Sequence, residues 1–189
     1  SPEEAGQSAG FARFSQEGRV PSLPFLPPVR GAVRHFVAMR ESQVSRPVVT
    51  VATIVVRNGE FLLVEEETRD GVRLNQPAGH LEAGETLVDA AVRETLEETA
   101  YRVVPVALVG IYRWQAPGAG TTFLRFAFAG EMVAHETGRT LDDGILRALW
   151  LTYDGLVARH AMHRSPLVLR CVDDYRAGLR RPLDLVTEM

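Results

Sequence analysis

The sequence predicts an α/β protein in which helices cover the faces of a β-sheet. Two observations carry this prediction. Stretches rich in Val, Ile, Thr and Phe recur along the chain, as is typical of strands. Two other segments, 86–99 and 165–178, have the composition or the end signals of helices. Several strands mixed with a few helices favour a sandwich in which a sheet is packed between helices.

Length and composition predict one domain with an extension. A chain of 189 residues is long enough to bury one complete hydrophobic core. Residues 1–47 differ from the rest because they contain the Pro-rich stretch 20–28, which cannot sustain a helix. We therefore predict an N-terminal extension over 1–47 that the function does not need, and a functional domain over 48–189.

Composition also excludes several classes of partner. A net charge of −3 provides no basic field for a nucleic acid polymer. No apolar run approaches the roughly 18 residues that a membrane span needs. We therefore expect a soluble, cytoplasmic protein, monomeric or homodimeric, that binds a small molecule. Cys171 is the single cysteine, which leaves no intrachain disulfide and no zinc-type spacing.

The chain contains no lysine, since every basic residue is an arginine. This excludes a P-loop lysine and a Schiff-base nucleophile. Any phosphate group must therefore be bound by arginine, by backbone amides or by a metal ion.

A hairpin opens the predicted domain. The β-rich run 48–56 is followed by Asn58-Gly59, a strong signal for a two-residue turn, and then by the apolar run 61–64. Two antiparallel strands follow from this pattern. Further strands are predicted at 103–113, 121–134 and 145–151.

Two helices are predicted. Residues 86–99 lack Gly and Pro and are rich in Ala, Leu and Glu, and a tight-turn segment, 78–84, precedes them. The second helix has Ser165 as its cap, Pro166 at its first position and Gly178 at its end.

Three carboxylates share one face of the first helix. Glu94, Glu97 and Glu98 stand at i, i+3 and i+4, so their side chains converge and repel one another unless a cation lies among them. Arg93 supplies one positive charge and reaches Glu97 at i+4. Oxygen ligands without zinc-type cysteines or histidines favour a hard ion, Mg²⁺ or alternatively Mn²⁺.

The residues around these carboxylates argue against an ordinary solvated acidic face. From Gly79, five residues lead to Glu85, seven more lead to Arg93-Glu94, and two more lead to Glu97-Glu98. This spacing resembles the Nudix box of the Nudix hydrolase family. The box differs at Ala100, where the family usually has a glycine that ends the helix in a left-handed turn. Alanine there costs about 1 kcal/mol or shifts the cap.

Further segments extend the resemblance. Residues 75–82, 123–126 and 164–167 are similar to the NudJ-type phosphatase branch of that family. The resemblance implies a Nudix-type α/β/α sandwich with a mixed central sheet and a cytoplasmic, Mg²⁺-dependent enzyme. It also implies nucleoside di- and triphosphates and hydroxymethylpyrimidine pyrophosphate as substrates, with orthophosphate as a product.

The resemblance also assigns roles within the box. The metal ligands it implies are the carboxylates of Glu94, Glu97 and Glu98 and the carbonyl of Gly79. Glu94 is also a candidate for the base. Arg93 and Glu85 match positions that orient those carboxylates.

A further acid is expected from the loop before the last strand. Asp142 and Asp143 are both candidates. The position directly before Ile145, often acidic in the family, is Gly144, so the identity of this acid stays open.

Candidate substrate contacts lie on the two long strands. Arg113 and Arg125 carry guanidinium groups that fit phosphate oxygens. Trp114 and Phe123 are candidates for stacking on a planar ring. Strand alternation places Phe123 and Arg125 on one face, whereas Trp114 beside the Pro117 loop suits the rim of a pocket.

Three hypotheses follow. The leading one is a phosphatase that releases orthophosphate from pyrimidine pyrophosphate and nucleotides. The second keeps the same helix but cleaves the inner anhydride of a dinucleotide or sugar nucleotide into two monophosphates. The third is a Nudix-like module that binds nucleotides without hydrolysis, which is disfavoured because the box carboxylates are all present.

Overall fold

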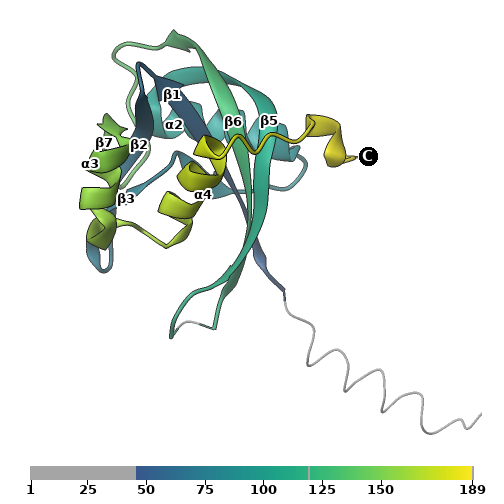
Figure 1. Cartoon of the computed structure of the whole chain (residues 1–189), viewed down its shortest axis with the longest axis horizontal. Coiled ribbons are helices and arrows are strands. Elements are labelled where there is room, and N and C mark those ends of the chain that lie inside the picture. Colours follow the sequence, from purple (N-terminus) through teal and green to yellow (C-terminus); the bar gives the residue numbers. More distant parts are fainter. Residues whose placement is uncertain (1–45, 119, 189) are drawn as a thin grey trace, which may run out of the picture. The chain divides into compact units, whose positions relative to one another are not determined.

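The computed structural model describes residues 46–118 and 120–188 (Figure 1). The predicted extension, 1–47, therefore lies outside the described residues except at its last two positions. The strands in the described part are β1 Val48–Arg57, β2 Glu60–Thr68, β3 Gly71–Asn75, β4 Ala78–His80, β5 Tyr101–Gln115, β6 Thr122–His135 and β7 Ile145–Thr152. The helices are α2 Leu87–Thr99, α3 Tyr153–Ala158 and α4 Leu167–Arg176, with 3₁₀ turns η1 His160–Met162 and η2 Leu183–Leu185.

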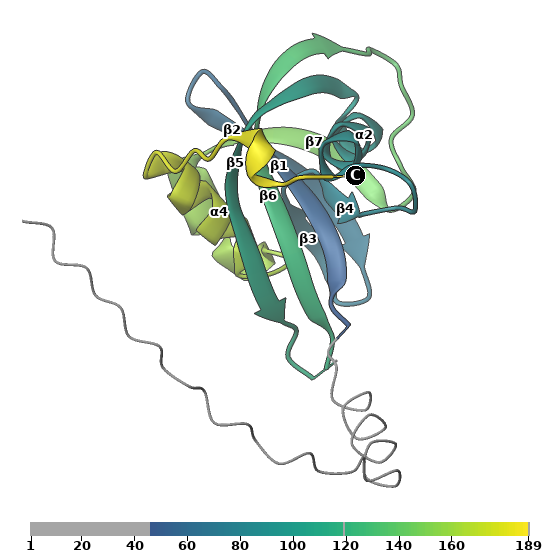
Figure 2. The same ribbon diagram turned by 90° about the vertical axis from the view of Figure 1, so that its right-hand side faces the viewer.

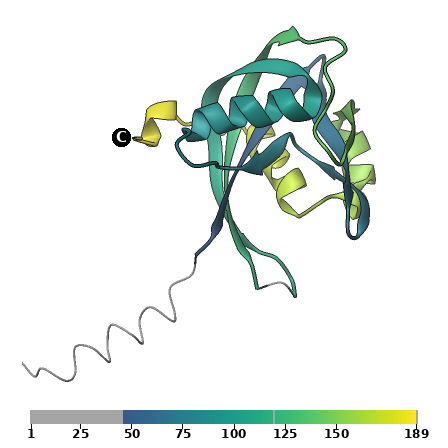
Figure 3. The same ribbon diagram turned by 180° about the vertical axis from the view of Figure 1, so that it is seen from behind.

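The strands form one mixed sheet. Its main order is β3-β2-β1-β6-β5, with β4 paired to β1 and β7 paired to β2. The β1–β6 pair is parallel, whereas the other pairs are antiparallel. Helix α2 covers one face and α4 the other, as Figures 2 and 3 show. The predicted α/β sandwich with a mixed sheet is thereby confirmed. Within the described residues, no helix is both long enough and apolar enough to span a bilayer.

The first hairpin forms as predicted. Asn58 and Gly59 have φ angles of 52° and 80°, the left-handed values that a two-residue hairpin turn of the mirror-image type requires. The register pairs Arg57 with Glu60 directly across this turn. Asn and Gly tolerate these angles at low cost, so the turn determines how β1 and β2 pair.

Strand alternation divides the core between the two faces. On β6, Phe128 is buried against α2 together with Val51 of β1. Ala127 points the other way, into the cluster that contains Ile54 and the α4 residue Val168. A different helix therefore covers each face of the sheet. The strand ends between the two helices remain available for a site.

Helix α2 starts and ends where the sequence predicts. The Thr86 hydroxyl accepts a hydrogen bond from the Asp89 amide, closing the first turn. Ala100 has a φ of 60° and its amide donates to the Leu96 carbonyl at 2.9 Å. Alanine thus takes the left-handed position without shifting the cap, at the expected cost of about 1 kcal/mol.

The tight-turn prediction for 78–84 was only partly right. Ala78–His80 forms strand β4, which pairs with residues 50–52 of β1. The segment Ala78–His80 has no strand pattern of its own. It forms a strand because the neighbouring edge of β1 is available for pairing. Strand β3 and helix α3 were not predicted either, because both are short and lack a clear periodicity.

Candidate active site

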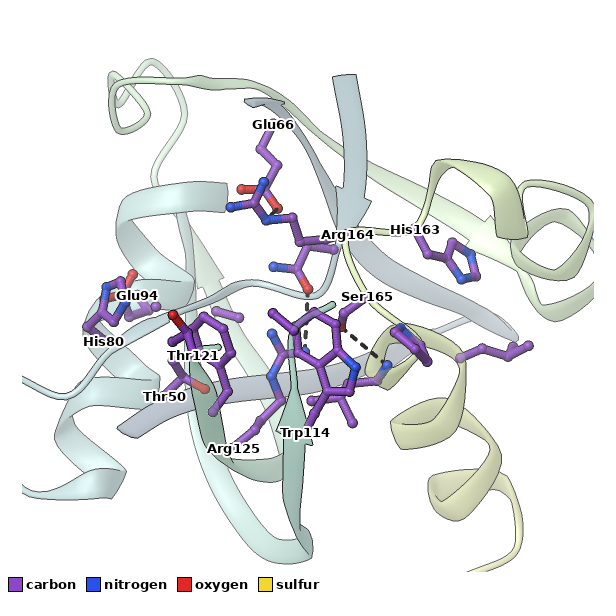
Figure 4. Close-up of a pocket in the computed structure, with 18 of the residues that line it drawn as sticks. Thr50, Glu66, His80, Glu94, Trp114, Thr121, Arg125, His163, Arg164 and Ser165 are labelled. Atoms are coloured by element: carbon purple, nitrogen blue, oxygen red, sulfur yellow. Dashed lines mark hydrogen bonds and ion pairs between the residues drawn. The ribbon is translucent and has the colours of Figure 1, made fainter. Parts of the chain in front are cut away.

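A cleft of about 1120 Å³ opens between the C-terminal half of α2, the β5–β6 hairpin and the segment that leads into α4. Figure 4 shows side chains from all three converging on it. Trp114 and Phe123 provide its large aromatic surfaces. The charged and histidine residues of its lining are Glu66, Asp70, His80, Glu94, Glu98, Arg125, Asp142, His160, His163 and Arg164.

Two of the predicted ligand carboxylates are buried in this cleft. Glu94 is 8% exposed and Glu98 is 9% exposed. Burial raises the pKa of Glu94, an effect that hydrogen bonding to Arg93 partly opposes. Burial also raises the pKa of Glu98 to about 8, against a 2.8 Å hydrogen bond from the Ala78 amide to its Oε2. Two neighbouring buried carboxylates with raised pKa values form a site that a cation would stabilise.

Gly79 lies directly against Glu94. It is held in β4 opposite Val51, and a Cβ atom at position 79 would approach the Glu94 carboxylate to 2.1 Å. A side chain at this position would therefore push Glu94 out of place. Glycine at position 79 therefore allows Glu94 to occupy this position, and the reason lies in the close approach rather than in the backbone angles of Gly79.

Arg93 connects the helix to the turn before it. Its Nε and Nη2 donate to the two carboxylate oxygens of Glu85 at 2.9 and 2.7 Å. Its Nη1 donates to Glu94 at 2.8 Å and to Glu97 at 3.1 Å, which confirms the predicted i+4 contact. The pKa of Glu85 is lowered mainly by its hydrogen bonding to Arg93. Arg93 thus fixes Glu94 and Glu97 relative to Glu85.

The described residues contain no preassembled group of three or more Asp, Glu, His or Cys side chains around a metal position. The contacts explain this. Glu94 and Glu97 face the Arg93 guanidinium, and Glu98 accepts from the Ala78 amide. Carboxylate oxygens are the donors that a hard ion requires, and those of Glu94 and Glu98 line the cleft.

The loop before β7 brings one of the two candidate acids to the cleft. The Asp142 amide donates to the Glu97 carbonyl at 3.1 Å, which docks this loop on the end of α2. Asp142 lines the cleft, and its charge contributes to the raised pKa values of Glu94 and Glu98. Asp143 is exposed and lies outside the lining.

The two candidate stacking residues lie together. Trp114 and Phe123 are directly opposite in the β5–β6 register, and their rings stack with centroids 5.7 Å apart and planes 24° apart. Phe126 packs instead with Phe128 on the α2 face. The alternation predicted for β6 is therefore confirmed, and the stacked pair forms an aromatic wall of the cleft.

The two candidate phosphate-binding arginines differ sharply. Arg125 lines the cleft and is 8% exposed, and its Nε is buried without a hydrogen-bond partner among the described residues. Its Nη1 lies 3.4 Å from both Asn75 Oδ1 and Gln76 Oε1, long for hydrogen bonds, and burial lowers its pKa. Arg113 is exposed, and the structure does not bring it into the cleft.

Sequence reasoning gave no role to two other charged residues of the cleft, Glu66 and Arg164. Glu66 belongs to the run Glu65-Glu66-Glu67, which is typical of a solvated strand edge. Nothing in that run distinguishes the middle residue. Its place becomes evident only once β2 is paired with β3 and β7.

Comparison with known proteins agrees with this geometry. The family model described as NUDIX domain matches residues 45–171. Phosphatase NudJ of Escherichia coli (strain K12) is 40% identical over 141 residues, covering 75% of this chain and 91% of that protein. Phosphatase NudJ of Shigella flexneri matches equally well.

Solved structures extend the comparison. A NUDIX hydrolase from Nitrosomonas europaea is 48% identical, with a TM-score of 0.75, and the match covers 76% of this chain and 98% of that one. A UDP-X diphosphatase, at 16% identity and a TM-score of 0.58 over 79% of this chain and 73% of that one, shares the fold alone.

Proposed function

Because the chain belongs to the Nudix family and is a hydrolase acting on phosphoanhydrides, we propose that it is a Mg²⁺-dependent phosphatase of small pyrophosphates. Its substrates are nucleoside di- and triphosphates and hydroxymethylpyrimidine pyrophosphate, from which it releases orthophosphate. One observation carries the proposal: the buried Glu94–Glu98 pair and the Trp114–Phe123 stack line the same cleft. Such a cleft holds a phosphoanhydride at one end and a planar ring at the other.

Glu94, Glu97, Glu98 and the Gly79 carbonyl would hold Mg²⁺, or Mn²⁺ in its place. When bound, the ion would neutralise the charge that develops on the phosphoryl oxygens. The burial and mutual repulsion of Glu94 and Glu98 fit such an ion, since these buried carboxylates lack enough positive charge of their own.

The protein side chains prepare the attacking water. Glu94 would accept a proton from this water at a carboxylate oxygen, and its burial favours proton uptake. Arg93, held by both oxygens of Glu85, keeps Glu94 and Glu97 in place. The water attacks phosphorus in line, and no covalent enzyme intermediate is needed.

The other half of the cleft would hold the leaving group. A pyrimidine ring stacks on the face of Trp114 beside Phe123. Arg125, with its buried Nε free of protein partners among the described residues, offers a donor to an anionic or carbonyl oxygen of the substrate. We assign no substrate contact to Arg113, because it is exposed outside the cleft.

We place the enzyme domain at 48–189 and leave 1–47 as an extension that turnover does not need. The residues that line the cleft all fall between Thr50 and Leu169, which supports this division. We propose a cytoplasmic protein, monomeric or homodimeric, with small-molecule partners and no nucleic acid polymer or membrane partner.

Product analysis tests the proposed function. The full chain is incubated with nucleoside di- and triphosphates, hydroxymethylpyrimidine pyrophosphate, a dinucleotide and a sugar nucleotide, with Mg²⁺ or with EDTA. Orthophosphate is expected only from the nucleoside di- and triphosphates and from hydroxymethylpyrimidine pyrophosphate, and only in the presence of Mg²⁺. Two monophosphates from the dinucleotide or sugar nucleotide, without orthophosphate release, would favour cleavage of the inner anhydride instead.

The two loop aspartates are expected to differ in their effect on catalysis. Asp142→Asn should lower kcat about 10- to 100-fold, because this carboxylate lies beside Glu94 and Glu98 in the cleft. Asp143→Asn is the matched control one residue away, and it should keep kcat within about twofold because Asp143 does not line the cleft. If both variants changed kcat to the same extent in steady-state assays, Asp142 would not belong to the site.

A further inference from the structure

Glu66 of β2 and Arg164, just before α4, lie side by side on the cleft wall (Figure 4). The Arg164 Nε is 3.9 Å from Glu66 Oε1, too far for a hydrogen bond. That oxygen is shielded from solvent and has no hydrogen-bond partner among the described residues. The two charges attract each other, but neither is fully satisfied by the contact.

Arg164 has a fixed backbone, and its guanidinium contacts Glu66 without a hydrogen bond. Its amide donates to the Leu74 carbonyl at 2.8 Å, and the preceding His163 bridges to Leu74. The side chain is 47% exposed and makes no hydrogen bond within the described part of the chain. Arg93, in contrast, has its donors engaged by carboxylates and the His80 carbonyl. Arg164 therefore has donors available for a ligand that enters from solvent.

An irregularity in strand β2 directs the Glu66 side chain toward this position. The β2–β7 register shifts between Glu65 and Glu66, a bulge of the kind that redirects side chains beside active sites. Glu65 forms a 2.6 Å ion pair with Arg147, whose side chain is 64% exposed. Glu66 instead faces the cleft and Arg164.

The cleft is negatively charged beside α2. Glu94, Glu98 and Asp142 line it and would repel the outer oxygens of an incoming pyrophosphate. A guanidinium on the Glu66 wall would offset this repulsion. An arginine is well suited, because its planar donors match the oxygens of a phosphate.

We propose that Arg164 binds the terminal phosphate of the substrate and selects pyrophosphates whose outer phosphate is unesterified, while Glu66 holds the guanidinium until substrate arrives. A terminal phosphate offers three oxygens and up to two negative charges, whereas an internal, esterified phosphate offers fewer of each. This inference rests on the proposed function, and it gives a reason for the release of orthophosphate from chain ends.

Two non-hydrolysable ligands separate the alternatives. The first is the α,β-methylene analogue of cytidine diphosphate, and the second is the same compound with a methyl ester on its outer phosphate. Their Kd values are measured by calorimetry on the full chain with Mg²⁺. Arg164→Gln is expected to raise Kd for the uncapped analogue about ten- to hundredfold and for the capped analogue less than about threefold. Arg164→Lys, which retains the charge, should recover part of the loss.

Two further variants control for indirect effects. Arg147→Gln removes the neighbouring arginine–glutamate pair and should leave both Kd values unchanged. Glu66→Gln releases Arg164 without removing it, so it should not weaken binding of the uncapped analogue. If Arg164 served only to hold Glu66, Glu66→Gln would reproduce the effect of Arg164→Gln.

This inference would be overturned if Arg164→Gln changed both Kd values equally. It would also be overturned if Glu66→Gln weakened binding of the uncapped analogue as much as Arg164→Gln does. Neither result would contradict the proposed function, because turnover by the wild-type chain tests that function independently. Failure of the wild-type chain to bind either analogue would contradict both. Melting temperatures of the variants confirm that the fold is retained.

Discussion

Replacing Glu98 with glutamine is expected to lower metal-dependent kcat about a thousandfold, equivalent to about 4 kcal/mol of transition-state stabilisation. The substitution removes one proposed metal ligand but keeps the shape of the side chain. The amide oxygen of glutamine can still accept the hydrogen bond from the Ala78 amide. Glu97→Gln is expected to have an effect in the same direction.

The fold should survive the Glu98 change. Glutamine resembles the protonated carboxyl, and burial already raises the pKa of Glu98 to about 8. Glutamine cannot ionise, so it never places a second negative charge beside Glu94, and the melting temperature should be unchanged or higher. Glu131→Gln, an exposed position on β6 outside the cleft, is the matched control and should retain full activity. If Glu98→Gln retained most of its rate at saturating Mg²⁺, the ligand assignment would fail.

Truncating Trp114 to alanine is expected to raise KM about ten- to hundredfold with little change in kcat. The indole stacks on Phe123 and lines the same cleft as the carboxylates of Glu94 and Glu98. A stacking contact with the base or pyrimidine is the same in the ground state and the transition state, so its loss weakens binding without slowing the chemical step. Steady-state kinetics on a pyrimidine nucleotide measure both constants.

Trp114→Phe is the matched control, because it retains a ring at the same position and should recover most of the affinity. Trp114 also packs partly against the core cluster that includes Val109, so melting temperatures must accompany the kinetics. A collapsed kcat with unchanged KM would remove Trp114 from the ring pocket.

The features that the sequence predicted well are those specified by nearby residues. Asn58-Gly59 determines its own hairpin, because both residues accept left-handed angles. The helix that carries Glu94 and Glu98 is specified by its composition and its Thr86 cap. The box spacing then places these carboxylates on one helical face without any knowledge of the sheet.

Other features depend on contacts between distant segments. Glu66 and Arg164 meet only because β2 pairs with β3 and the backbone of Arg164 bonds to Leu74. Strand β4 depends in the same way on the edge of β1. No local pattern carries such information, so these contacts could not be predicted.

The position of Arg113 outside the cleft follows from strand alternation alone. Arg113 and Trp114 are neighbours on a strand, so their side chains point to opposite faces and cannot both enter one cleft. The structure brings Trp114 to the cleft and leaves Arg113 exposed. The choice between Asp142 and Asp143 is different, because it depends on how the loop docks on the Glu97 carbonyl.

Direct binding of Mn²⁺ to the full chain, followed by electron paramagnetic resonance, tests most directly whether the α2 carboxylates form the metal centre. The wild-type protein is expected to bind Mn²⁺ saturably, Mg²⁺ is expected to compete, and Glu98→Gln is expected to weaken binding at least about tenfold. Mn²⁺ binding of equal strength in the wild-type and Glu98→Gln proteins, or no binding by the wild-type protein, would contradict the account.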